Sequence, residues 1–166
     1  VQLIFAGKAH PADIPGQEVL ATVNQFARHP DFRNRVVFVP NYDAAIGRLL
    51  TQGCDVWLNN PRRPREASGT SGQKAALNGN LNFSTIDGWW PEGYDGKNGW
   101  IIGDTNDWED LEKQDQFDLE SMYKTLEDEI VPTFKSPQLW TNMMAHAIET
   151  CAPVFNTHRM VSDYLN

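Results

Sequence analysis

The sequence predicts an α/β fold with a parallel sheet, and three observations lead to this prediction. Short apolar runs typical of buried strands occur at residues 1–7 (VQLIFAG), 35–40 (RVVFVP) and 54–58 (CDVWL). Segments with helical spacing of apolar residues separate these runs. Alternation of strand and helix favours parallel βαβ units, so the expected architecture is a partial, Rossmann-like α/β domain.

The helices between these strands have recognisable ends. The first is expected to begin near Gly16 and to reach Arg28, with apolar residues at mostly helical spacing. Asp43 stands where a helix cap is expected, and Gly53 is expected to close the second helix.

An acidic helical segment is expected after residue 103, with helices over 108–134, 136–155 and 157–165. Residues 104–129 hold 11 of the 22 acidic residues, which we interpret as a solvated helix face. We therefore divide one domain into an α/β core over 1–103, which carries the candidate site, and a helical C-terminal segment over 104–166.

Composition excludes several classes of protein. The chain has 166 residues and a net charge of −8, which argues against a nucleic-acid binder. No apolar run is long enough to cross a membrane. Cys54 and Cys151 are too few for a disulfide framework, so a cytoplasmic location is expected, and neither they nor the histidines show metal-ligand spacing. Because Val1 opens the chain inside an apolar run, we expect a piece of a longer protein.

A candidate anion site lies in residues 61–79 (PRRPREASGTSGQKAALNG). Small residues over 68–72 allow close approach of a ligand to the backbone, and residues 73–77 have helix-forming character, with Asn78 and Gly79 as the stop. A small, Gly-containing loop that leads into a helix N-terminus can bind an anion, because the first N–H groups are unpaired there.

Lys74 is expected in the first turn of that helix. The helix dipole would disfavour an ammonium group there and favour the neutral amine that Schiff-base chemistry requires. The spacing fits neither the phosphate loop of nucleotide hydrolases nor the G-x-G-x-x-G fingerprint.

These residues form a longer pattern. Residues 66–70 (EASGT) precede Lys74, residues 77–79 (LNG) follow it, and residues 85–88 read TIDG. This pattern resembles the pyridoxal-phosphate site of the glycogen/starch α-glucan phosphorylases, in which a strand lies between L-N-G and T-x-D-G. The sequence of residues 61–103 resembles the shorter bacterial type of that family.

The resemblance implies the cofactor pyridoxal 5′-phosphate and a set of residues that hold it. Lys74 would form the Schiff base, Thr70 and the backbone at Ser71 would hold the 5′-phosphate, and Tyr42 would pack against the pyridoxal ring. The muscle-type pattern has Gly-Asn-Met at residues 71–73, where this chain has Ser-Gly-Gln. The muscle-type pattern also has Arg after the Tyr. This chain has Asp43 at that position and therefore lacks a phosphate-facing cation.

The resemblance also implies the substrates. Glu66, Ser68 and Gly69 would bind hydroxyl groups of the transferred glucose. Inorganic phosphate would attack terminal glucose of an α-1,4-glucan (glycogen, starch or maltodextrin) and release glucose 1-phosphate. The fold would be the C-terminal half of a glycosyltransferase with two Rossmann-like domains, so this chain would need the N-terminal domain and be inactive alone. Exposed apolar surface would then favour a homo-oligomer.

Two other functions stay open at this point. A nucleotide-sugar glycosyltransferase could use Glu66 for a ribose or sugar and Thr70 for a diphosphate, although it would not need Lys74. A non-catalytic carbohydrate-binding module is the second alternative.

Other residues carry two interpretations each. Trp89 and Trp90 are expected to pack in the core, with stacking on sugars as the alternative. Three arginines at 62, 63 and 65 could steer phosphate or merely solvate the loop, and Cys54 is expected to be an inert core residue of the third strand.

Overall fold

A computed structural model describes residues 1–106 and 108–165 of the chain. It divides into two compact units, Val1–Leu49 and the residues from Leu50 onward, and each unit is described here by itself. None of the helices in these described ranges is long and apolar enough to cross a membrane.

The first unit contains a two-stranded parallel sheet. Strand β1 (Leu3–Ala6) pairs with β2 (Val36–Val39), and α1 (Ile14–Arg28) connects them through a single 3₁₀ turn. Helix α1 begins two residues before the expected position because Asp13 caps it, with the Gly16 N–H donating to Asp13 Oδ1 over 3.0 Å. Helix α2 (Ala44–Gly53) begins in this unit and runs into the second.

The first strand is exposed, which contradicts the expectation of a buried strand. Leu3, Ile4 and Phe5 are 41%, 49% and 38% exposed. A sheet of two strands gives each strand only one strand neighbour, so it buries fewer side chains than the wider sheet that was expected.

The second unit is built on a three-stranded parallel sheet in the order β3-β4-β5. The strands are β3 (Val56–Asn59), β4 (Leu81–Thr85) and β5 (Gly99–Ile102).

Cys54 precedes β3 and is half-buried, so its assignment to the third strand is wrong. Burial and, less strongly, Asp55 raise the pKa of its thiol.

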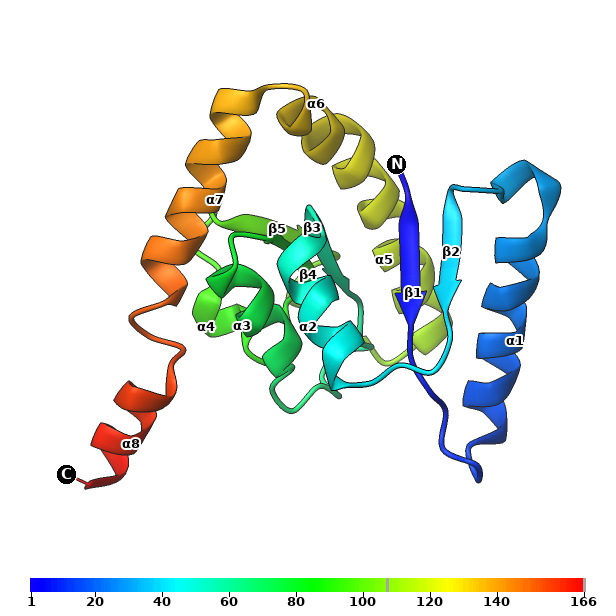
Figure 1. Cartoon of the computed structure of the whole chain (residues 1–166), viewed down its shortest axis with the longest axis horizontal. Helices are drawn as coiled ribbons and strands as arrows, with labels where there is room; N and C mark the ends of the chain where they lie inside the picture. Colours follow the sequence, from blue (N-terminus) through cyan, green and yellow to red (C-terminus); the bar gives the residue numbers. More distant parts are fainter. Residues whose placement is uncertain (107, 166) are drawn as a thin grey trace. The chain divides into compact units, whose positions relative to one another are not determined.

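Helices α3, α5 and α7 contact this sheet, and Figure 1 shows α8 extending away from it at the C-terminal end of the chain. Helix α5 begins at Leu111 and not at residue 108, because Asp110 accepts hydrogen bonds from the first N–H groups. It continues through a π-helical turn (Leu126–Ile130) into α6. The ranges are α3 (Thr70–Leu77), α4 (Trp90–Gly93), α5 (Leu111–Thr125), α6 (Val131–Phe134), α7 (Pro137–Cys151) and α8 (Thr157–Leu165).

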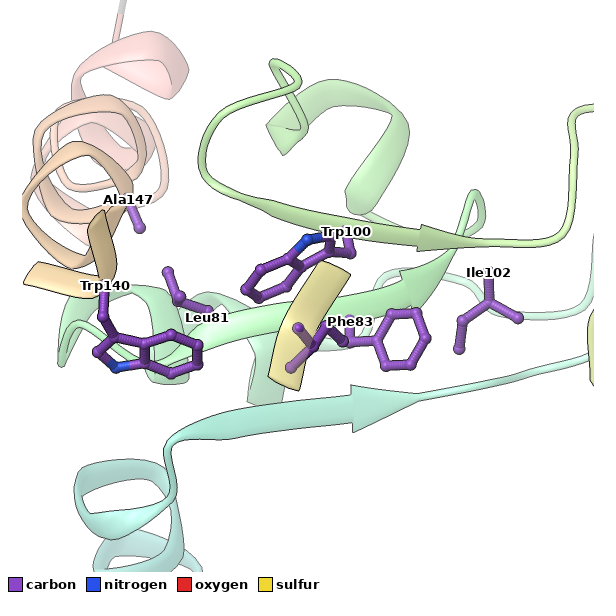
Figure 2. Close-up of a cluster of buried hydrophobic side chains, with 7 residues drawn as sticks. Leu81, Phe83, Trp100, Ile102, Trp140 and Ala147 are labelled. Atoms are coloured by element: carbon purple, nitrogen blue, oxygen red, sulfur yellow. The ribbon is translucent and has the colours of Figure 1, made fainter. Parts of the chain in front are cut away.

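Strand β4 is buried along its whole length and presents different side chains to its two faces. Leu81 and Phe83 point into an apolar core with Trp100 of β5 and Trp140 of α7. The two indole rings stack with centroids 6.0 Å apart, and Figure 2 shows them beside Leu81. The α5–α7 segment therefore covers this face of the sheet.

The opposite face of β4 carries polar side chains and meets α3 and α4. Asn82 is buried there, and its Nδ2 donates to the Gly72 carbonyl of α3 over 3.0 Å. Trp89 and Trp90 are buried in a second apolar cluster with Phe155, so the packing interpretation of this pair is confirmed. Parallel strands with helices on both faces confirm the α/β class and its partial Rossmann-like arrangement.

Candidate functional site

The candidate loop lies where β3 and β4 end, because parallel strands place their carboxyl ends at the same edge of a sheet. Residues 60–69 leave β3 and lead into α3, and residues 86–89 leave β4. Gly69 has a left-handed backbone (φ +77°) immediately before α3, which a residue with a side chain adopts less readily.

Helix α3 begins at Thr70, three residues earlier than the sequence indicated. Lys74 is therefore its fifth residue and lies in the second turn. The expected position of Lys74 in the first turn is therefore wrong, and the effect of the helix dipole on charged side chains is confined to that turn. The predicted stop is confirmed, with Asn78 as the C-cap and Gly79 at φ +80°.

Thr70 and Lys74 are four residues apart on α3, so they lie on the same face of the helix. Both are exposed, and Ser71 next to Thr70 is half-buried. The Gly72 N–H donates to the Gly69 carbonyl over 3.2 Å, whereas the Thr70 and Ser71 N–H groups precede the first hydrogen bonds of the helix and could bind an oxyanion beside the Thr70 hydroxyl.

The opposite side of α3 is fixed to the sheet through Gly72. A Cβ atom at this position would lie 2.6 Å from Asn82 Oδ1 and 2.7 Å from Trp89 Nε1. Two buried side chains therefore occupy the space that any larger residue would need.

Asp87 joins the two loops at this edge. Its Oδ2 accepts the N–H groups of Arg65 and Glu66 over 3.1 and 2.9 Å, and its Oδ1 accepts the Gly88 N–H over 2.9 Å. The Trp89 N–H donates to the Ser68 carbonyl over 2.8 Å. The backbone of residues 65–68 is thus held against residues 87–89.

Glu66 is half-buried and its side chain lies between two glycines with positive φ. A Cβ on Gly88 would lie 2.8 Å from Glu66 Cγ, and a Cβ on Gly69 would lie 3.7 Å from its Cδ. Ser68 stays exposed beside it. Glu66, Ser68, Gly69, Thr70, Ser71 and Lys74 are therefore close together along one loop and the first turns of one helix.

The arginines of the loop are engaged with the acidic helical segment. Arg63 is buried, and it donates to Asp104 over 3.0 Å and to Asp118 over 2.8 Å. Arg62 Nε donates to Asp115 Oδ1 over 2.9 Å. Arg63 thus matches neither the phosphate-steering interpretation nor that of a solvated loop, whereas Arg62 pairs with Asp115 at the surface. Asp104 and Asp118 are partly buried beside Arg63, and the other described acidic residues of the segment are exposed, as expected of a solvated helix face. Arg65 has an exposed side chain.

Tyr42 belongs to the first unit and is exposed. Its ring lies over α2 at Gly47, where a Cβ would come 2.6 Å from the Tyr42 hydroxyl oxygen. Asp43 has a local role, because its Oδ1 accepts the Ile46 N–H over 2.8 Å and caps α2. The six other candidate residues all belong to the second unit.

Sequence reasoning missed two residues that shape this site. Asp87 and Gly88 were named only as part of the T-x-D-G pattern and were given no role. An Asp-Gly pair directly after a strand is nevertheless typical of a turn with a polar anchor. The buried pairs of Arg63 had no local signal, because its partners are 41 and 55 residues away in the sequence.

The fold and loop define a class: an α/β domain with a small-residue loop leading into a lysine-bearing helix. The carbohydrate phosphorylase family model matches residues 1–92, and the chain belongs to this family. It is 50% identical over 167 residues to the maltodextrin phosphorylase of Thermococcus litoralis, across all of this chain and 20% of that protein.

Two further relatives are glycogen phosphorylases. The chain is 46% identical over 172 residues to that of Aquifex aeolicus, across all of this chain and 24% of the relative. It is 47% identical over 171 residues to that of Mycobacterium bovis, across 99% of this chain and 20% of the relative. The chain thus spans about a fifth to a quarter of the length of these relatives.

Proposed function

We propose that the chain is the cofactor-binding part of an α-1,4-glucan phosphorylase, a glycosyltransferase that uses pyridoxal 5′-phosphate. The observation that carries this proposal is the juxtaposition on α3: Thr70 and Lys74 share one exposed helix face directly after the loop that bears Glu66. Family membership supports the same reaction class.

The donor set at α3 fits the proposed cofactor. The Lys74 amine would hold the aldehyde carbon covalently, while the Thr70 hydroxyl and the Ser71 N–H would bind the 5′-phosphate one helical turn away. Tyr42, from the first unit, is proposed to pack against the pyridoxal ring. When bound, the cofactor supplies a phosphate group that exchanges a proton with the attacking inorganic phosphate.

The loop before α3 is proposed to bind the sugar. The Glu66 carboxylate, the Ser68 hydroxyl and the backbone at Gly69 would accept or donate hydrogen bonds to hydroxyl groups of the transferred glucose. Gly69 and Gly88 leave room for the Glu66 side chain, and Asp87 accepts the Glu66 N–H, so we propose that this residue is positioned before the sugar arrives.

The substrates follow from the names of the relatives. Glycogen and maltodextrin phosphorylases are named for α-1,4-glucans, so we propose such a glucan and inorganic phosphate as partners. We further propose that an N-terminal domain of the same protein completes the pocket, that this chain alone is inactive and self-associates, and that the enzyme is cytoplasmic. The division into an α/β core over 1–103 and a helical segment over 104–166 is kept as part of this proposal.

An assay of phosphorolysis tests the proposed reaction. The full-length protein is incubated with maltodextrin and inorganic phosphate, and glucose 1-phosphate is measured, with Lys74→Ala as the inactive variant and Lys97→Ala as the matched control. Lys97 is an exposed lysine of the same unit. Release of glucose 1-phosphate that depends on Lys74 supports the proposal. Transfer from a nucleotide sugar without phosphorolysis would instead favour a nucleotide-sugar glycosyltransferase, and glucan binding without either reaction a non-catalytic module.

A further inference from the structure

Asp87 is a buried carboxylate with an unusual set of partners. It is 8% exposed, and in the described part of the chain no salt bridge reaches it. Its two oxygens accept three backbone N–H groups, from Arg65, Glu66 and Gly88. A buried carboxylate with only backbone donors serves to fix the backbone that supplies them.

The residue that gains most from this fixation is Glu66. Its N–H is held by Asp87 at 2.9 Å, and its side chain packs over Gly88, the next residue after Asp87. A Cβ on Gly88 would lie 2.6 Å from the Ser68 carbonyl oxygen, so Gly88 also permits the close approach of the two loops. Asp87 and Gly88 thus constrain both the backbone and the side chain of Glu66.

We infer that Asp87 and Gly88 are positioning residues that hold Glu66 and Ser68 in the geometry required to bind the transferred sugar. This inference rests on the proposed function. Asp87 does not touch the sugar, and it acts through the loop over residues 65–68. Lys74 has a support outside this loop, because Asn82 of β4 donates from Nδ2 to the Gly72 carbonyl of α3 over 3.0 Å.

This separation predicts a split between sugar binding and cofactor binding. An Asp87→Asn side chain keeps one acceptor oxygen and presents an NH₂ group to N–H donors, so at least one of the three bonds is lost. A displacement on the order of 1 Å at a positioned group costs up to about 100-fold in rate. The expected result is a fall of about 10- to 100-fold in kcat/KM, mainly through a higher KM for maltodextrin, with the cofactor adduct at Lys74 retained.

The experiment measures KM for maltodextrin, kcat, the borohydride-trapped pyridoxyl adduct at Lys74, and the thermal midpoint, all in the full-length protein. The variants are Asp87→Asn and Gly88→Ala, which disturb the same loop by different means. Asp95→Asn is the matched control, because Asp95 also accepts a backbone N–H, from Lys97 at 2.9 Å, but lies in another loop of the same unit. The control is expected to keep the wild-type KM.

The inference is supported if both variants raise KM and keep the Lys74 adduct, whereas Asp95→Asn does neither. The inference is overturned if either folded variant keeps the wild-type KM. It is also overturned if the rise in KM is accompanied by loss of the Lys74 adduct, which would indicate a merely structural role. If Asp87→Asn does not fold, Gly88→Ala decides; if neither folds, the role is structural and the inference is overturned. A wild-type protein that lacks both phosphorolysis and the adduct would instead refute the proposed function.

Discussion

The Arg63 guanidinium donates from Nη2 to Asp118 Oδ1 over 2.8 Å and joins the loop before α3 to helix α5. Its Nη1 donates to Asp104 over 3.0 Å, and the Arg63 side chain is only 6% exposed. Gly103 leaves room for this contact, because a Cβ there would lie 3.0 Å from Arg63 Nη2. The ion cluster therefore connects the candidate site to the acidic helical segment.

Replacing Arg63 should destabilise the second unit strongly. Arg63→Met leaves Asp104 and Asp118 without their cation, and loss of one partner from a buried ion pair costs about 3–5 kcal/mol. Urea unfolding measures this change. Arg62→Met is the matched control, because Arg62 pairs with Asp115 at the surface, where loss of the pair has little effect. Equal losses from the two variants would contradict the structural role of Arg63.

Asp95 should make the second unit sensitive to acid. Burial alone would raise the pKa of Asp95, but hydrogen bonds from the Lys97 N–H and His146 outweigh it, so the pKa lies below its ordinary value of 3.8. A carboxyl whose pKa is lower in the folded state stabilises the fold above the unfolded-state pKa, and this stabilisation is lost as the pH falls through the folded pKa.

Urea unfolding between about pH 6 and pH 3 checks this sign. The wild-type protein should lose stability at the acid end, and Asp95→Asn should be less stable near pH 6 and show a shallower decline. A variant with the same slope as the wild-type protein would show that Asp95 does not contribute to acid sensitivity.

Gly72→Ala should destabilise the second unit although alanine favours helices. The gain in helix propensity is up to about 1 kcal/mol, whereas forcing a methyl group against packed side chains costs about 1–3 kcal/mol. The steric cost should dominate because the contacts, at 2.6 and 2.7 Å, involve the buried side chains of Asn82 and Trp89. Gln73→Ala is the control, since it makes the same helix more alanine-rich without that clash. Unfolding free energies that favour Gly72→Ala over the wild-type protein would contradict the contact.

Local patterns predicted much of the fold. Apolar runs identified β1 to β3, and cap residues Asp43 and Asn78 gave helix ends correctly. Strands β4 and β5 were not identified by periodicity, because they are only five and four residues long and lie in a stretch rich in Gly, Asn and Ser that is typical of loops. Only the resemblance implied a strand before residues 85–88.

The candidate site was predicted less completely. The sequence pattern of the loop indicated Glu66 and Lys74. The start of α3, however, depends on the left-handed backbone of Gly69, which composition does not show. The anchoring of residues 65–66 by Asp87 depends on two loops meeting at one sheet edge. Such long-range contacts arise from the fold and have no signal within either loop.

The most direct test of the central claim is covalent trapping at Lys74. The full-length protein is incubated with pyridoxal 5′-phosphate, reduced with borohydride, digested, and analysed by peptide mass spectrometry. We predict a pyridoxyl adduct at Lys74 that is absent from Lys74→Ala and unchanged in Lys97→Ala. A wild-type protein with no adduct at Lys74, or with lysines modified indiscriminately, would contradict the assignment of α3 as the cofactor site.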